Sequence, residues 1–166
     1  MEADAETLSV LADRLFVQTF VEELGIPYPL EDLQGFLAYA NGPEAMARRL
    51  RDKDVGVWLA EHEGRAVAYA VAGPADLPHE DLKPWHGMLS RLYLEAEWRG
   101  RGLAEPMLAQ ALAWLEAEYS ARPWLTVWIG NHRAQRFYAR HGFEVCGACD
   151  YPVGSWTDRE LVMRRA

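Results

Sequence analysis

Two glycines two residues apart follow a predicted strand and precede a long predicted helix. The segment Arg99-Gly100-Arg101-Gly102-Leu103-Ala104 comes directly after a β-prone run and a short polar turn. Glycine lets the backbone approach a ligand closely, and the first turn of a helix presents unpaired N–H groups with a partial positive charge. This arrangement predicts a phosphate-binding turn. An ordinary strand-to-helix turn would have the same residue pattern.

Two other phosphate-binding motifs are poor fits to this segment. A Walker A loop ends in Gly-Lys-Ser or Gly-Lys-Thr, and the sequence contains neither. A dinucleotide-binding fingerprint needs a third glycine, and Glu105 stands at that position. The glycine pattern therefore argues against a nucleotide-binding module.

A second group of polar and aromatic residues follows the strand-forming run at residues 124–129. Asn131, Ala134, Phe137 and Tyr138 have the spacing Asn-x-x-Ala-x-x-Phe-Tyr. The amide of Asn131 can bridge a ligand and the backbone, and it can equally cap the helix that follows. Tyr138 offers a phenol as a proton donor, although a tyrosine in a short helix often serves only in packing.

Together these segments resemble the two acetyl-CoA motifs of the GNAT superfamily of N-acetyltransferases. The first matches Gln/Arg-x-x-Gly-x-Gly/Ala, and the second matches Asn-x-x-Ala-x-x-Phe-Tyr-x-x-x-Gly-Phe, ending here at Gly142-Phe143. The tail, Gly154 to Asp158 with Leu161 to Met163, is similar to the closing hairpin of the family. The resemblance covers residues 55–164. The helical part before it looks most like the bacterial spermidine/spermine acetyltransferase branch.

The resemblance implies an acetyl-CoA site built largely from backbone groups. The strand before the loop would pair with the pantetheine amides, and the N–H groups around residues 101–104 would hold the pyrophosphate. Glu105 departs from this pattern, because it places a negative charge beside the phosphates. The residues expected to bind acetyl-CoA are Leu92, Tyr93, Leu94, Arg99, Gly100, Arg101, Gly102, Leu103, Ala104, Asn131 and Tyr138.

Catalysis needs an acid and a base, and only the acid matches the family. Tyr138 matches the general acid that protonates the departing CoA thiolate. An amine with a pKa of about 10 must lose a proton before it attacks a thioester. Family members often carry a carboxylate on the strand before the loop, where this chain has Ser90 and no acidic residue between 88 and 94. Glu95, His86 or a chain of water molecules are the remaining candidates, and we take Glu95 as the catalytic candidate; as a glutamate at a strand end, it could also be a solvated turn residue.

Acidic residues gather around the first helix–helix turn, a region that in the family walls the acceptor pocket. Such carboxylates could hold a polyamine, or they could form a solvated acidic loop. A face of three arginines could reach the ribose phosphate of CoA, or could equally be solvated. The acidic residues are Glu22, Glu23, Glu31 and Asp32, and the basic face contains Arg133, Arg136 and Arg140.

Two cysteines, Cys146 and Cys149, form a C-x-x-C motif that we interpret as free thiols. No second pair completes a zinc site, and redox pairs of this kind usually open a helix rather than lie in a strand. Neither cysteine has an evident histidine partner. Direct transfer without an acyl-enzyme is therefore expected, and no metal is expected.

The candidate site residues must be positioned by helices and strands, which alternate along the sequence. Helical periodicity predicts helices over residues 4–25, 30–39, 44–51, 102–119 and 134–141. β-Prone runs predict strands over residues 55–61, 65–72, 88–94, 124–129, 143–148 and 160–164. The family usually begins with a strand before the first helix. Six residues are too few for one here, so the strand is absent or the chain starts late.

Length and composition exclude several other classes of protein. A chain of 166 residues, half of them hydrophobic, fits one domain over residues 1–166. No apolar run reaches the roughly 18 residues of a membrane helix, and the N-terminus lacks a signal-peptide pattern. We therefore expect a cytoplasmic protein without a membrane partner. The net charge of −8 argues weakly against nucleic acid.

The sequence thus predicts an α/β protein with the GNAT-like fold, a central mixed, mostly antiparallel sheet flanked by helices. We expect it to transfer acetyl from acetyl-CoA, as co-substrate, to a small-molecule primary amine in a ternary complex. The amine could be a polyamine, an antibiotic, an amino acid, a peptide N-terminus or a protein lysine. The alternative is a non-catalytic acetyl-CoA-binding sensor on the same fold. A homodimer stays open.

Overall fold

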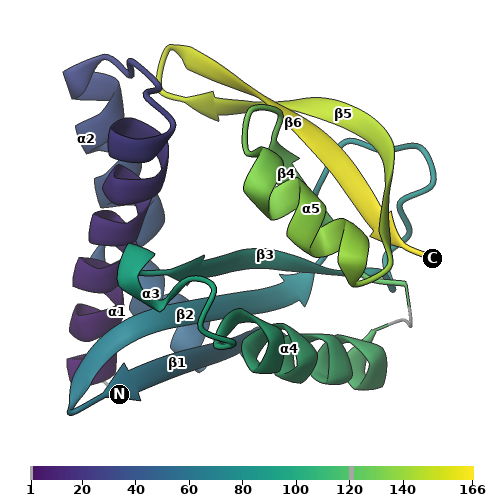
Figure 1. Cartoon of the computed structure of the whole chain (residues 1–166), viewed down its shortest axis with the longest axis horizontal. Helices are drawn as coiled ribbons and strands as arrows, with labels where there is room; N and C mark the ends of the chain where they lie inside the picture. Colours follow the sequence, from purple (N-terminus) through teal and green to yellow (C-terminus); the bar gives the residue numbers. More distant parts are fainter. Residues whose placement is uncertain (1, 120–121) are drawn as a thin grey trace.

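A six-stranded sheet forms the centre of the computed structural model, which describes residues 2–119 and 122–166. The strands lie in the order β1-β2-β3-β4-β6-β5, and every neighbouring pair is antiparallel except β3 and β4 (Figure 1). Their bounds are β1 Gly56–His62, β2 Arg65–Pro74, β3 Gly87–Leu94, β4 Trp124–Trp128, β5 Phe143–Val153 and β6 Trp156–Arg165. The prediction of a mixed, mostly antiparallel sheet is confirmed.

The parallel pair β3 and β4 is held together at one end only. Parallel neighbours need a crossover, and helix α4 (Ala104–Glu118) supplies it. The two strands share the single register pair Met88↔Trp124 and then separate. The β4-facing edge of β3 beyond this pair is consequently left without a strand partner, in the middle of the sheet.

Helix α4 covers one face of β2 and β3 with the apolar stripe that its sequence predicts. Met107, Leu108, Ala111, Leu112 and Leu115 are all buried. They pack against strand residues from both halves of the sheet. Full burial of a leucine-sized side chain contributes about 1.5–3 kcal/mol, so this stripe fixes the helix and its N-terminus against the strands.

Three helices cover the opposite face. Helix α1 (Glu2–Phe16) buries Leu8, Leu11 and Leu15, together with Met46 of α3 (Pro43–Arg51), against Tyr69 and its neighbours on β2. Helix α2 (Leu30–Asn41) stands beside α1 (Figure 1). The first helix was expected to continue to the glycine at position 25. Instead α1 ends at Phe16, and a π-helical segment, Val17–Glu23, follows it.

The remaining short elements frame the C-terminal half. A 3₁₀ turn, Ala96–Trp98, follows β3, and helix α5 (His132–Arg140) covers β4, β5 and β6 (Figure 1).

The closing hairpin is longer than the sequence indicated, because β5 extends to Val153 and β6 begins at Trp156. Polar residues and a proline interrupt its apolar pattern, so the sequence-based strands stop too early. The long hairpin reaches the start of α2, where the Ser155 hydroxyl donates to Asp32 over 2.6 Å.

Candidate active site

A cleft of about 430 Å³ lies where β3 and β4 separate. Its walls come from β3, the glycine turn, the first turn of α4, strands β4 and β6, helix α5 and the π-helical segment. Of the residues expected to bind acetyl-CoA, nine line it: Leu92, Tyr93, Leu94, Arg99, Gly100, Gly102, Ala104, Asn131 and Tyr138. Residues of both sequence motifs therefore line the same cleft.

The β3 wall is shaped by a bulge. Val71 of β2 pairs with Arg91 while Ala72 pairs with Leu89, which leaves Ser90 as the extra residue. The Ser90 hydroxyl donates to the carbonyl of Val71 over 3.1 Å. Bulges of this kind bend a strand and increase its twist. The bend helps β3 to diverge from β4, which leaves the β4-facing backbone groups from Leu89 to Tyr93 available to an extended ligand.

The glycine turn leaves open space beside its backbone. Gly100 and Gly102 have φ angles of +70° and +79°, and a Cβ at either position would have no heavy atom within 4 Å. The backbone conformation itself, rather than crowding, requires glycine here. Ala104 begins α4, so its first N–H groups point toward the same end of the cleft. Glu105, the residue that departs from the family pattern, also lines the cleft, so its negative charge lies near the expected phosphate position.

Two members of the predicted phosphate loop lie elsewhere. Leu103 packs in the apolar cluster around Met107 rather than against the cleft. The side chain of Arg101 is exposed and does not line the cleft. The expected contributions of these two residues are therefore limited to their backbone groups.

Arg99 holds the turn in place through contacts with two elements, strand β3 and the π-helical segment. Its Nε donates to the carbonyl of Leu94 over 3.0 Å, and one Nη donates to the hydroxyl of Thr19 over 3.2 Å. The other Nη is paired with the carboxylate of Glu23, which also pairs with Arg133 of α5 over 3.2 Å. Glu23 thus joins two cationic residues of the cleft, and its carboxylate is not free for an acceptor.

Tyr138 lies in the cleft with its ring packed between Phe137 and Phe143, at centroid distances of 5.4 and 5.8 Å. The residue is 9% exposed. Burial raises the pKa of its phenol, because the charged form would lose hydration. The phenol therefore keeps its proton at neutral pH and can donate it. Asn131 also lines the cleft, where its Oδ1 caps α5 by accepting from the Ala134 N–H over 3.1 Å.

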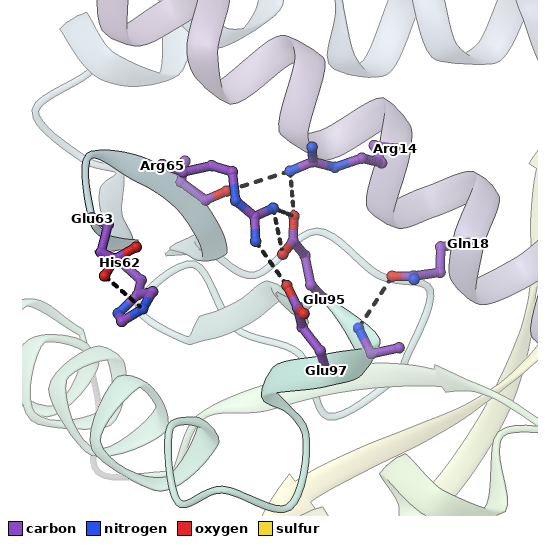
Figure 2. A network of polar contacts seen from close by, with 9 residues as sticks. Arg14, Gln18, His62, Glu63, Arg65, Glu95 and Glu97 are labelled. Carbon is purple, nitrogen blue, oxygen red and sulfur yellow. Dashed lines mark hydrogen bonds and ion pairs between the residues drawn. The ribbon is translucent and has the colours of Figure 1, made fainter.

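Glu95 belongs to an ion-pair network outside the cleft. Its side chain is buried, and its carboxylate contacts the guanidinium groups of Arg14 at 2.5 Å and Arg65 at 2.6 Å (Figure 2). Arg65 also pairs with Glu97 over 2.7 Å. This network joins α1, the start of β2 and the end of β3. The structure thus corrects the expectation of Glu95 as general base, because two arginines hold its carboxylate away from the cleft.

His86 lies at the wrong end of β3 for catalysis. It precedes the strand, beside Trp124 at a ring distance of 5.6 Å, where β3 and β4 are still paired. Burial and the nearby Arg164 and Lys83 lower the pKa of its imidazole. It does not line the cleft.

One acidic residue of the cleft was not singled out from the sequence. Glu160 of β6 lines the cleft, and its Oε2 is buried without a hydrogen-bond partner. Burial raises the pKa of its carboxyl, and so does the charge of Asp158, whereas a hydrogen bond with Thr126 lowers it. The available signal was the alternation Asp158, Glu160, Val162, which places two acids in line with a buried valine on one face of a strand.

Several other groups lie apart from the cleft. Glu31 and Asp32 border a second hollow between α2, α3 and β5, and the hydroxyl of Ser155 lowers the pKa of the Asp32 carboxyl. Cys146 and Cys149 lie in β5 as free thiols. Over residues 2–119 and 122–166, no three His, Cys, Asp or Glu side chains gather as a metal site. None of the helices in those same ranges is long and apolar enough to cross a membrane.

The sequence also matches a known family over most of its length. Residues 17–143 match the model of the acetyltransferase (GNAT) family. An uncharacterised N-acetyltransferase of Mycobacterium tuberculosis is 31% identical over 98% of this chain and 97% of its own. The chain belongs to the GNAT family of acetyltransferases. It is therefore an acetyl-CoA-dependent N-acetyltransferase.

Two further relatives of this acetyltransferase are informative. A spermine/spermidine N(1)-acetyltransferase of Bacillus subtilis is 31% identical over 60% of this chain and 64% of its own. The crystal structure of the PaiA N-acetyltransferase from Thermoplasma acidophilum in complex with coenzyme A has a TM-score of 0.73. It is 18% identical and covers 99% of this chain and 93% of that one, so it supports the fold.

Proposed function

We propose that residues 1–166 form one catalytic domain that transfers acetyl from acetyl-CoA to a primary amine by direct attack in a ternary complex. The observation that carries this proposal is the cleft between β3 and β4, with its unpaired strand edge and the buried phenol of Tyr138. An extended pantetheine could pair with the edge of β3, and the pyrophosphate could lie at the glycine turn and the N-terminus of α4. The arginines of α5 that line the cleft offer positive charge beside it.

The proposed role of Tyr138 is to protonate the sulfur as the C–S bond breaks. A phenol that burial keeps neutral is a suitable donor, since the proton is available over the whole neutral range. A covalent acyl-enzyme would need an activated nucleophile in the cleft. The two cysteines lie in β5 and do not line it.

The acceptor class that we propose to test first is a polyamine. The relative from B. subtilis named a spermine/spermidine acetyltransferase supports it, as does the negative net charge of −8. Beside Glu160, which lines the cleft, aromatic rings surround the buried carboxylate of Asp158. Tyr28 donates to Asp158, and the indole of Trp156 donates to the same carboxylate over 3.0 Å. Rings and acids together suit a cationic chain.

Initial rates with acetyl-CoA and spermidine, both varied, test the proposed mechanism. A ternary complex predicts double-reciprocal lines that intersect. Parallel lines would indicate an acetylated enzyme and contradict direct transfer. If acetyl-CoA binds but no amine releases CoA, the catalytic proposal fails and the sensor takes its place.

A further inference from the structure

The carboxylate of Glu160 is an unusual group to find in this cleft. One of its oxygens, Oε2, is buried and makes no hydrogen bond, while Thr126 provides a hydrogen bond to the carboxyl. Among the residues that the structure describes, none of the ion pairs includes Glu160. A buried carboxylate oxygen without a hydrogen-bond partner costs free energy. Such a group suggests a partner that arrives with the substrate.

Glu160 enters the cleft from the face of the sheet opposite α5. Side chains alternate along a strand, and Leu161 and Met163 pack in the same cluster as Tyr138. Val162 packs on the other face, with Trp124 and Cys149. Glu160 shares the face of Val162. Tyr138 and Glu160 therefore line one cleft from its two sides, as an acid and a base acting on opposite partners would need to.

The groups that face Glu160 are neutral or acidic. Its charge interacts with the phenols of Tyr28, Tyr93 and Tyr151, the thiol of Cys149 and the carboxylate of Asp158. The neighbouring Arg159 pairs with Asp150 over 2.6 Å. Arg91, which also lines the cleft, donates to Asn41 and to the carbonyl of Ala40. Neither of these two arginines is therefore bound to the carboxylate of Glu160.

We infer that Glu160 is the catalytic base that takes a proton from the acceptor ammonium, an assignment that rests on the proposed amine acetyltransfer. The ammonium gives one proton to the Glu160 carboxylate. The nitrogen lone pair then forms a bond to the acetyl carbonyl carbon, and the C–S bond to CoA breaks. The nitrogen loses a second proton to solvent, and the CoA sulfur gains one from Tyr138. Glu160 then gives up its proton and the Tyr138 phenolate regains one, so that amide, thiol and one net released proton balance the reaction.

The surroundings of Glu160 improve it as a base for an amine. Burial and Asp158 raise the pKa of its carboxyl toward that of the amine, which lessens the uphill cost of the transfer. Activity requires the ionised carboxylate, so kcat/KM of the wild type should rise with pH through this raised pKa. The acid side of the profile should be lost when Glu160 is replaced.

Glu160→Gln tests the inference, with Glu144→Gln on the exposed surface of β5 as the matched control. The acceptors are the best amine of a panel and its fluorinated analogue, whose lower pKa leaves it unprotonated at neutral pH. With the ordinary amine, Glu160→Gln should lower kcat/KM by about 10²-fold or more, the usual lower range for a positioned base. With the analogue the loss should be below about 10-fold, because no proton needs to be removed before attack. Glu144→Gln should match the wild type with both.

Several results would overturn the inference. Equal losses with the two amines would indicate a structural or binding role, and full activity of Glu160→Gln would exclude any role. Glu160→Asp, which keeps a carboxylate, should retain more activity than Glu160→Gln, and the reverse order would contradict the base. Thermal unfolding must show that each variant is folded. If the wild type acetylates no amine, the proposed function fails first, and the inference fails with it.

Discussion

Burial favours the neutral form of both groups that we assign to proton transfer. The phenol of Tyr138 keeps its proton until charge develops on sulfur, and the carboxylate of Glu160 becomes a stronger base. The same loss of hydration thus raises the pKa of both groups in one cleft.

Replacing Tyr138 by phenylalanine should separate the role of its hydroxyl from that of its ring. The ring still packs between Phe137 and Phe143, so stability should change little. Because the hydroxyl acts as charge develops on sulfur, kcat and kcat/KM should fall together by about 10²-fold or more. Acetyl-CoA affinity by calorimetry should be unchanged. Full activity of Tyr138→Phe would remove Tyr138 from the mechanism.

The sequence pointed to the proposed acid but not to the proposed base, for a physical reason. Tyr138 lies within a spaced motif on one short helix, so its position can be predicted locally. Glu160 reaches the cleft only because β6 pairs with β4 and because β4 diverges from β3, which are contacts between distant segments. Glu95 had the expected place in the chain, but Arg14 and Arg65, also distant in sequence, pair with its carboxylate.

At the scale of elements, the glycine turn between β3 and α4 offers a matched pair of substitutions. Gly102 has a positive φ, which Asp and Asn adopt more readily than other non-glycine residues. The variants Gly102→Asp and Gly102→Asn therefore differ mainly in charge. Asp places a negative charge at the expected pyrophosphate. Calorimetry should therefore show acetyl-CoA binding at least about 10-fold weaker for Asp than for Asn, a difference of about 1.4 kcal/mol. Equal affinities in two folded variants would contradict the phosphate assignment.

The Glu95 network ties α1 to β2 and to the end of β3, so its loss should be felt mainly in stability. Glu95→Gln keeps the shape but leaves Arg14 and Arg65 without their charge partner (Figure 2). Loss of one partner of a buried pair costs about 3–5 kcal/mol, and about half of that is expected here because both arginines are about half exposed. Denaturant unfolding measures the change. A large loss of kcat without loss of stability would instead support Glu95 as a catalytic group.

The bounds of elements with a regular apolar pattern were predicted from the sequence, whereas the bounds of elements whose pattern is interrupted were not. The stripe of α4 and the β-prone run of β4 lie within two residues of their expected bounds. The closing hairpin was cut short because Asp150, Pro152 and Asp158 break its pattern. The π-helical segment that follows α1 has no local sequence signature, and its Thr19 and Glu23 contact Arg99, which is distant in sequence.

The net charge of −8, spread over the protein, should affect how a cationic acceptor arrives. Raising the ionic strength from about 10 to about 150 mM shortens the screening length from roughly 30 to 8 Å. kcat/KM for spermidine should fall across this range, while that for a zwitterionic amino acid should change little. Turnover of neutral or anionic amines above spermidine would contradict the polyamine proposal.

The central claim, acetyl transfer to an amine in the cleft between β3 and β4, is tested most directly by CoA release. The wild type would be supplied with acetyl-CoA and each member of a panel of polyamines, amino acids, antibiotics and peptides. We predict CoA release that depends on the amine, is greatest with polyamines and yields one acetylated amine for each CoA. Tight binding of acetyl-CoA with no release above the amine-free rate, for any member of the panel, would contradict the claim.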